Sequence, residues 1–166
     1  MFNRIEIPCP ALEEIGRRFR AVAEFYSVLF RPATPKHFGH DFQAGFLEML
    51  KENRLEQAVP KLLPLSYSAA SKFAVLNKYE FEGSLISAFL QGTCTDRVVA
   101  DEREAYEVVR TIMKSLLLRP NGSILAIRMD DPSWSALSNA ATLSWAYFVY
   151  ESSQQIWWFV CFADYY

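Results

Sequence analysis

The chain has 166 residues, of which 51% are hydrophobic and 15% aromatic, and its formal charge is −2. This length fits one domain, residues 1–166, with a sizeable core, and the aromatic content excludes a disordered chain. Every apolar run is shorter than the roughly 18 residues of a membrane-spanning helix, so we expect no membrane association. The first residues, Met1–Glu6, contain no apolar run, and we expect no secretory signal.

The three cysteines, Cys9, Cys94 and Cys161, are an odd number at wide spacings. This pattern fits neither a disulfide framework nor a paired zinc site. We therefore expect buried, reduced thiols, which indicate a reducing compartment and a cytoplasmic location.

The first third of the chain predicts two helices. Apolar residues at steps of three and four predict an amphipathic helix over residues 10–30, with this stripe: Leu12, Ile15, Phe19, Val22, Tyr26 and Leu29. Thr34 followed by Pro35 is typical of a helix start, and the helical spacing of phenylalanines that follows continues to about Asn53. Residues 55–63 contain Pro60 and precede Pro64, so both a helix and a loop are compatible with them.

The middle of the chain gives weaker signals. Residues 72–76 are compatible with the end of a helix, and residues 79–82 alternate like a strand that pairs with residues 84–90 across Gly83. Asp101 and Glu104 then resemble a capping box at the start of a helix that ends before Pro120. Residues 123–129 predict a short strand.

The last part of the chain predicts a β-hairpin. Two aromatic runs, residues 145–150 and 156–162, flank a polar connection, and both faces of each strand are apolar. Such strands need cover on two sides, or a partner on one of them. Trp157 and Trp158 must then face opposite sides of the sheet. We expect an α+β fold, with N-terminal helices packed on a small, mainly antiparallel sheet that ends in this hairpin.

The sequence contains no catalytic, nucleotide-binding or cofactor motif, so we expect no enzyme, no cofactor and no metal. One alternative remains open. His37, His40 and Asp41 share one helix face and could hold a metal, or a histidine could pair with one of the cysteines as a nucleophile. The simpler interpretation of these three residues is a solvated patch at a helix start.

Charge is distributed unevenly along the chain. From Met129 to Tyr166 there are four acidic residues and no lysine or arginine. An acidic segment repels phosphate and suits a basic partner, so we expect a protein partner and no nucleic acid.

The stretch from Ser133 through Trp145–Tyr150 to Trp157–Asp164 resembles the aromatic C-terminal strands of small bacterial immunity proteins of polymorphic-toxin and contact-dependent growth inhibition systems. The resemblance implies a cytoplasmic protein that binds and occludes the toxic domain, often a nuclease, of a cognate effector, with no catalytic residue of its own. On this hypothesis acidic residues steer association and aromatic residues anchor it. The expected contact residues are Asp130, Asp131, Trp134, Glu151, Asp164, Tyr165 and Tyr166.

Two other functions stay open at this point. One is a small metal-dependent or Cys/His-dependent enzyme. The other is a structural subunit that oligomerises through the aromatic hairpin, since the sequence does not define the oligomeric state.

Overall fold

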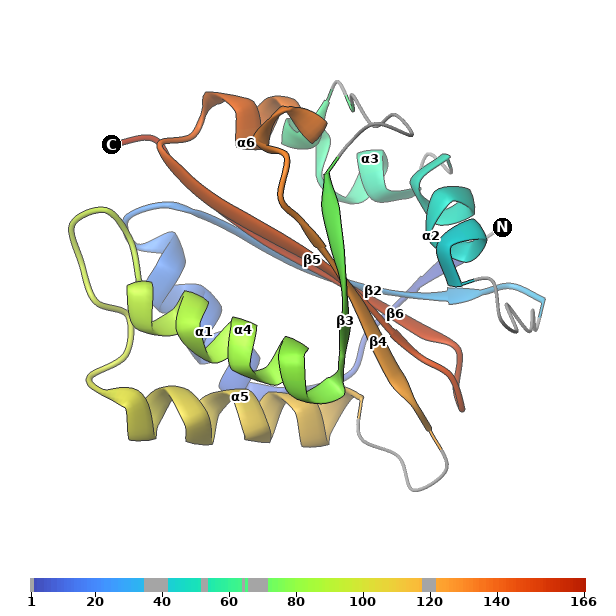
Figure 1. The fold of residues 1–166 in the computed structure, drawn as a ribbon, viewed down its shortest axis with the longest axis horizontal. Helices are drawn as coiled ribbons and strands as arrows, with labels where there is room; N and C mark the ends of the chain where they lie inside the picture. The colour runs from blue at the N-terminus through green and yellow to red at the C-terminus, as the bar shows by residue number, and fades with distance from the viewer. Residues whose placement is uncertain (1, 35–41, 52–53, 64, 66–71, 118–121) are drawn as a thin grey trace.

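A central antiparallel sheet organises the molecule (Figure 1). The computed structural model describes residues 2–34, 42–51, 54–63, 65, 72–117 and 122–166. Its six strands are β1 (Phe2–Ile5), β2 (Glu24–Pro32), β3 (Phe73–Asn77), β4 (Ile124–Met129), β5 (Leu143–Glu151) and β6 (Ile156–Asp164). They lie in the order β1-β2-β6-β5-β4-β3, with every neighbouring pair antiparallel. The expected α+β fold with a C-terminal hairpin is confirmed.

Helices cover both faces of this sheet, as Figure 1 shows. One layer contains α1 (Pro10–Arg20), α4 (Lys78–Gln91) and α5 (Glu102–Leu116). The other contains α2 (Phe42–Lys51), α3 (Arg54–Ala58), the 3₁₀ turns η1 (Pro60–Leu62) and η2 (Pro132–Trp134), and α6 (Ala136–Ala140). The result is three layers, with the sheet in the middle.

Two hydrophobic cores follow from this arrangement, one on each side of the sheet. Successive side chains of a strand point to opposite faces. Trp158 accordingly packs in the core under α1, α4 and α5, while Trp157 packs in the core under α2 and α6. Both rings are fully buried, so the chain's own helices supply the cover that the two apolar faces of the hairpin require.

The predicted helix over residues 10–30 is wrong beyond its first half. The helix ends at Arg20, and Glu24–Pro32 is a strand that pairs with both β1 and β6. The run from Phe25 to Phe30 is apolar at nearly every position, which suits a strand buried on two faces. Its spacing continued the helical stripe only by coincidence. Arg17, Arg18 and Arg20 in the last helical turn are the signal for the true end, because cations favour a helix C-terminus.

The predicted hairpin over residues 79–90 is also wrong, as is the helix end at residues 72–76. The latter segment is strand β3, and α4 begins directly after it. Asn77 accepts hydrogen bonds from the backbone N–H groups of Tyr79 and Glu80, and the Glu80 side chain accepts one from the Asn77 N–H. This reciprocal capping box explains the sharp change from strand to helix. Gly83 lies inside α4.

The segment between β2 and β3 is described in part. Helix α2 runs over Phe42–Lys51, and the expected start at Thr34-Pro35 lies at the boundary of the described residues. The segment 55–63, open between helix and loop, forms the short α3 and the turn η1.

From Asp101 onward, the structure confirms the predicted elements. Helix α5, strand β4 and the β5–β6 hairpin lie where they were predicted. Asp101 caps α5 by accepting a hydrogen bond from the Glu104 N–H at 2.9 Å. The Glu104 side chain, however, accepts from the N–H of Ala100 and not from that of Asp101.

Phe19 joins α1 to α4 and to two strands of the sheet in the first core. Its ring lies 5.3 Å from that of Phe25, 5.7 Å from Phe89 and 5.0 Å from Phe162. Replacing Phe19 by Ala should lower the free energy of unfolding by about 3–5 kcal/mol, because it removes these contacts and leaves a cavity. Urea titration measures the change. Tyr79→Ala, on a side chain that is 77% exposed, is the control and should shift stability by less than about 0.5 kcal/mol.

Candidate binding surface

Glu151 and Trp134, two of the seven residues predicted to contact a partner, are buried. Glu151 is fully buried, and its carboxylate accepts hydrogen bonds from the N–H groups of Ser153 and Gln154, each at 2.9 Å. It closes the β5–β6 turn against Gly122, where an added Cβ would lie 1.7 Å from Glu151 Oε1. Trp134 is buried in the second core, and its Nε1–H donates to Ser138 Oγ at 3.0 Å. Both positions are structural, and neither presents a surface to a partner.

Asp164 is also buried, with 5% of its surface exposed. Its carboxylate accepts hydrogen bonds from the N–H of Cys94 at 2.8 Å and of Tyr166 at 3.2 Å. These bonds hold the pKa of Asp164 below its usual range. The side chain therefore ties the end of β6 to the segment after α4, and it is a positioning residue for the tyrosines that follow it.

The remaining four predicted residues are accessible and lie toward one end of the sheet. Strand β4 ends at Met129, on the side where β5 begins and β6 ends, because Leu143 pairs with Asp164. Asp130 and Asp131 follow β4, while Tyr165 and Tyr166 follow β6. The tyrosines are 48% and 83% exposed. We call these four residues the end surface.

The charges on the end surface have local partners. Arg128 Nε donates to Asp130 at 2.6 Å, so this acid is paired. Asp131 accepts from the side chain and the N–H of Ser133, which lower the pKa of its carboxyl group and keep it ionised. The four acidic residues of the last quarter therefore do not form one exposed acidic surface, because Glu151 and Asp164 are buried and Asp130 is paired with Arg128.

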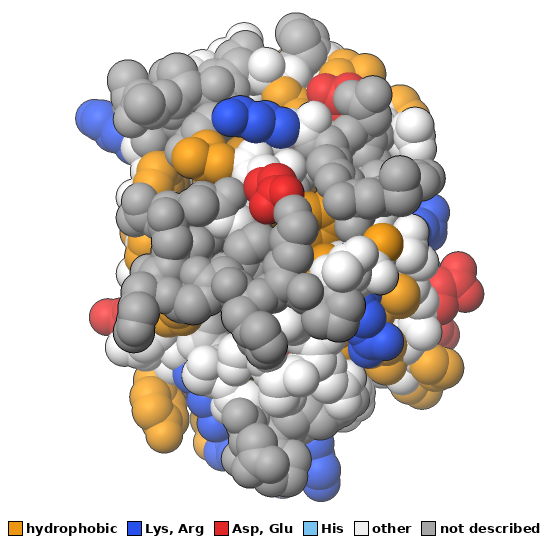
Figure 2. All heavy atoms as spheres, turned by 90° about the vertical axis from the view of Figure 1, so that its right-hand side faces the viewer, with side chains coloured by type: hydrophobic (Ala, Val, Ile, Leu, Met, Phe, Trp, Pro, Cys, Tyr) orange, Lys and Arg blue, Asp and Glu red, His pale blue; other side chains and the backbone are white. Residues whose placement is uncertain are grey.

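The opposite end of the sheet carries mixed charge. Figure 2 looks onto the side where the β5–β6 turn lies. There the described Lys, Arg, Asp and Glu side chains are interspersed with hydrophobic ones and form no acidic patch. The acidic composition of the last quarter thus does not become an acidic face on this side.

The turn between α1 and β2 joins the end surface, and the sequence did not reveal it. Arg20, Val22 and their neighbours line a hollow of about 390 Å³ together with Tyr165 and Tyr166. Arg20 and Val22 also line a second hollow, of about 610 Å³, with Arg17 and Arg97. The turn was hidden because the helical pattern was extended through it.

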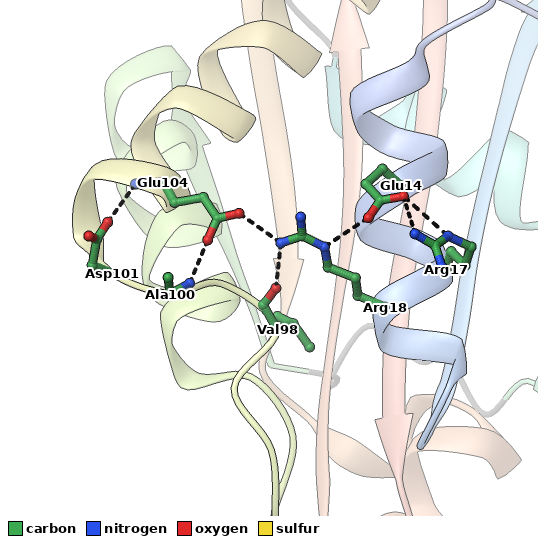
Figure 3. Close-up of polar contacts among 7 residues, drawn as sticks. All are labelled: Glu14, Arg17, Arg18, Val98, Ala100, Asp101 and Glu104. Atoms are coloured by element: carbon green, nitrogen blue, oxygen red, sulfur yellow. Dashed lines mark hydrogen bonds and ion pairs between the residues drawn. The ribbon is translucent and has the colours of Figure 1, made fainter.

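Arg18 connects the segments beside these hollows (Figure 3). Its guanidinium donates to Glu14 at 3.0 Å, to the Val98 carbonyl at 3.0 Å and to Glu104 at 2.7 Å. The backbone N–H of Ala100 and Arg18 lower the pKa of Glu104. Helix α1 is thereby tied to the start of α5. Each of these charged groups has a partner within the protein, which indicates a structural role.

Chemically reactive groups are sparse among the described residues. They contain no group of three or more His, Cys, Asp or Glu side chains placed to hold a metal ion. His37, His40 and Asp41 lie outside the described residues, and so does the metal or Cys/His site that they would form.

The cysteines differ in exposure. Cys9 and Cys161 are buried as expected, whereas Cys94 is exposed, which corrects that prediction. Burial raises the pKa of the Cys161 thiol. Desolvation and the neighbouring Asp164 carboxylate raise the pKa of Cys94. Both thiols are therefore poor nucleophiles near neutral pH.

No helix in the described part of the chain has both the length and the apolar character needed to cross a membrane. The fold and this surface define a three-layer α+β protein with an aromatic, mixed-charge end. Comparison with models of known protein families and with curated proteins found no match.

Removing the Asp164 carboxylate tests its positioning role. Asp164→Ala should lower the free energy of unfolding by about 1–3 kcal/mol at pH 7, because two backbone donors lose a buried acceptor. The pKa of Asp164 is depressed in the folded protein, so its contribution is fully present above the unfolded pKa of about 3.9 and is lost as pH falls through the folded value. Urea titrations of both proteins between pH 7 and pH 2 should show the difference shrinking at the acidic end. A constant difference would contradict the role of the ionised carboxylate.

The Arg18–Glu104 pair is tested by a double-mutant cycle. Arg18→Ala, Glu104→Ala and the double variant should give a coupling energy of about 0.5–1 kcal/mol, since the pair is partly exposed. Exposed Arg103 and Glu107 on α5 form the matched control cycle. That cycle should give less coupling, and an equal value would mean that Arg18 does not tie the two helices together.

Proposed function

We propose that this protein is an immunity-type binding protein that occludes the toxic domain of a cognate effector in the bacterial cytoplasm. The effector domain would be a basic protein, such as the nuclease of a contact-dependent growth inhibition system. The protein would perform no reaction of its own, and the end surface would contact the partner.

The exposure of Tyr165 and Tyr166 carries this proposal. The aromatic side chains of β5 and β6 are buried, whereas these two, directly after β6, are turned to solvent. Tyrosine is enriched among the residues that contribute most to binding energy, because a rigid aromatic ring with a polar end loses little conformational entropy on binding. Asp164 and its two hydrogen bonds fix the backbone beside them.

The two acids of the end surface support a basic partner. Asp131 is ionised and its carboxylate is anchored by Ser133. Such a fixed charge steers a cationic protein toward the surface and increases its association rate. The neighbouring Arg128 partly compensates Asp130, so we assign the steering role mainly to Asp131.

Capture of the partner tests the proposal. The protein should retain the product of the adjacent reading frame at physiological salt, and should abolish its toxic activity at equimolar ratio. Tyr165→Ala combined with Tyr166→Ala should weaken the complex at least about tenfold, because each ring is expected to supply about 1 kcal/mol or more. Isothermal titration calorimetry measures the dissociation constant.

Two controls accompany this measurement. Tyr106→Ala removes a comparably exposed tyrosine from α5 and should leave affinity unchanged. Asp131→Lys should mainly slow association, and less so at high salt. Retention of no partner, or unchanged affinity in the double tyrosine variant, would overturn the proposal.

A further inference from the structure

Strand β2 has an open edge along half of its length. Its residues Glu24–Phe30 pair with β6 on one side. On the other side β1 pairs only with Leu29–Pro32, because β1 ends at Ile5 and the chain then turns away to α1. The outer edge of Glu24–Val28 is therefore left without a neighbouring strand in the described part of the chain.

The outward-facing backbone groups on this edge have no partner strand among the described residues. In an antiparallel strand, alternate residues direct both N–H and C=O toward each edge. Among the described residues, no turn or loop backbone hydrogen bond involves residues 24–28. The segment itself has no lysine, no proline and only one charge, Glu24, so its own side chains give this edge little protection.

A hollow of about 430 Å³ lies along this edge. One wall consists of β2, and the other of the β1–α1 connection and α1. The exposed lining is more polar than apolar, and four of its apolar residues are buried, namely Leu12, Phe25, Val28 and Leu29. Charged residues also line it, namely Arg4, Glu6, Glu13 and Arg20. A groove between a helix and a strand edge suits an extended chain, whose backbone can pair with the strand and whose alternate side chains can face the hollow.

The open edge is continuous with the end surface. Glu24 pairs with Ala163, so the edge begins opposite the end of β6. Arg20 lines both the hollow along the edge and the hollow that contains Tyr165 and Tyr166. A partner seated on the tyrosines thus lies next to the backbone groups of β2.

We infer that an extended segment of the protein partner adds to the sheet as a strand along Glu24–Val28, in the groove between β2 and α1. This inference rests on the proposed function and specifies how the partner is recognised. Backbone hydrogen bonds supply affinity, and the polar and charged lining of the hollow contacts every second side chain of the added segment.

Selection of peptides tests the groove even before a partner has been captured. A phage-displayed library of random dodecamers is selected on the immobilised full chain, and enriched peptides are measured by fluorescence anisotropy. Glu13→Trp, which places a large ring in the hollow, should weaken peptide binding at least about tenfold. Glu107→Trp, on an exposed helical site of α5, is the matched control and should bind as the unaltered protein does.

The hydrogen-bonding pattern gives a second, sharper readout. Methylation of the peptide backbone nitrogen at every second residue should weaken binding about tenfold, while methylation at the intervening residues has a smaller effect. Failure to enrich any peptide sensitive to Glu13→Trp would overturn the inference. So would a concentration-dependent dimer, by light scattering, that Glu13→Trp dissociates, because a second copy would then occupy the edge.

The two proposals fail separately. A captured partner that binds Glu13→Trp as tightly as the unaltered protein leaves the proposed function standing and removes the strand-addition mode. Peptides that bind in the groove, in a protein that retains no partner, support the groove and remove the proposed function.

Discussion

The pairing of β5 with β6 at the centre of the sheet is the constraint on which the rest of the structure depends. Nine consecutive residue pairs join the two strands, and every residue of β6 is buried. Since neither face of this hairpin can meet water, each needs its own helical layer. The two cores, and the positions of α1, α4 and α5 on one side and α2 and α6 on the other, follow from that requirement.

The same constraint determines what is left at the surface. Most aromatic side chains of the described residues are buried in the two cores. Tyr165 and Tyr166 are exposed because they follow the last paired residue, Asp164, whose buried carboxylate holds the backbone there. The two tyrosines of the end surface are therefore exposed because of where β6 ends, and the open edge of β2 results from where β1 ends.

The sequence predicted the elements whose pattern had one interpretation. The hairpin, β4 and α5 each combine a distinct periodicity with a turn or capping signal at their ends. The helix predicted through residues 20–30 was wrong because a strand buried on two faces is apolar at most positions. Such a run shows no alternation and can be read as the continuation of a helical stripe. The predictions for residues 72–90 were wrong because Gly83 was interpreted as a turn. The capping box formed by Asn77 and Glu80, which starts α4, was overlooked.

The candidate site was less predictable because charge along the chain is not charge on a surface. Glu151 and Asp164 accept backbone hydrogen bonds inside the protein, a role that no count of acidic residues reveals. Trp134 was indistinguishable in sequence from an exposed anchor. Arg20 and Val22 line the hollow beside the two tyrosines only because the chain turns there, and the predicted helix ran through that turn. The open edge of β2 depends on strand register, which the sequence does not give.

Hydrogen–deuterium exchange on the complex with the captured partner tests the central claim most directly, that a partner is recognised at the end of β6 and the adjoining edge of β2. Binding should slow exchange in residues 21–28 and 164–166, and leave the outer surface of α5 unchanged. Protection concentrated on α4 and α5, with residues 21–28 and 164–166 exchanging as in the free protein, would contradict it.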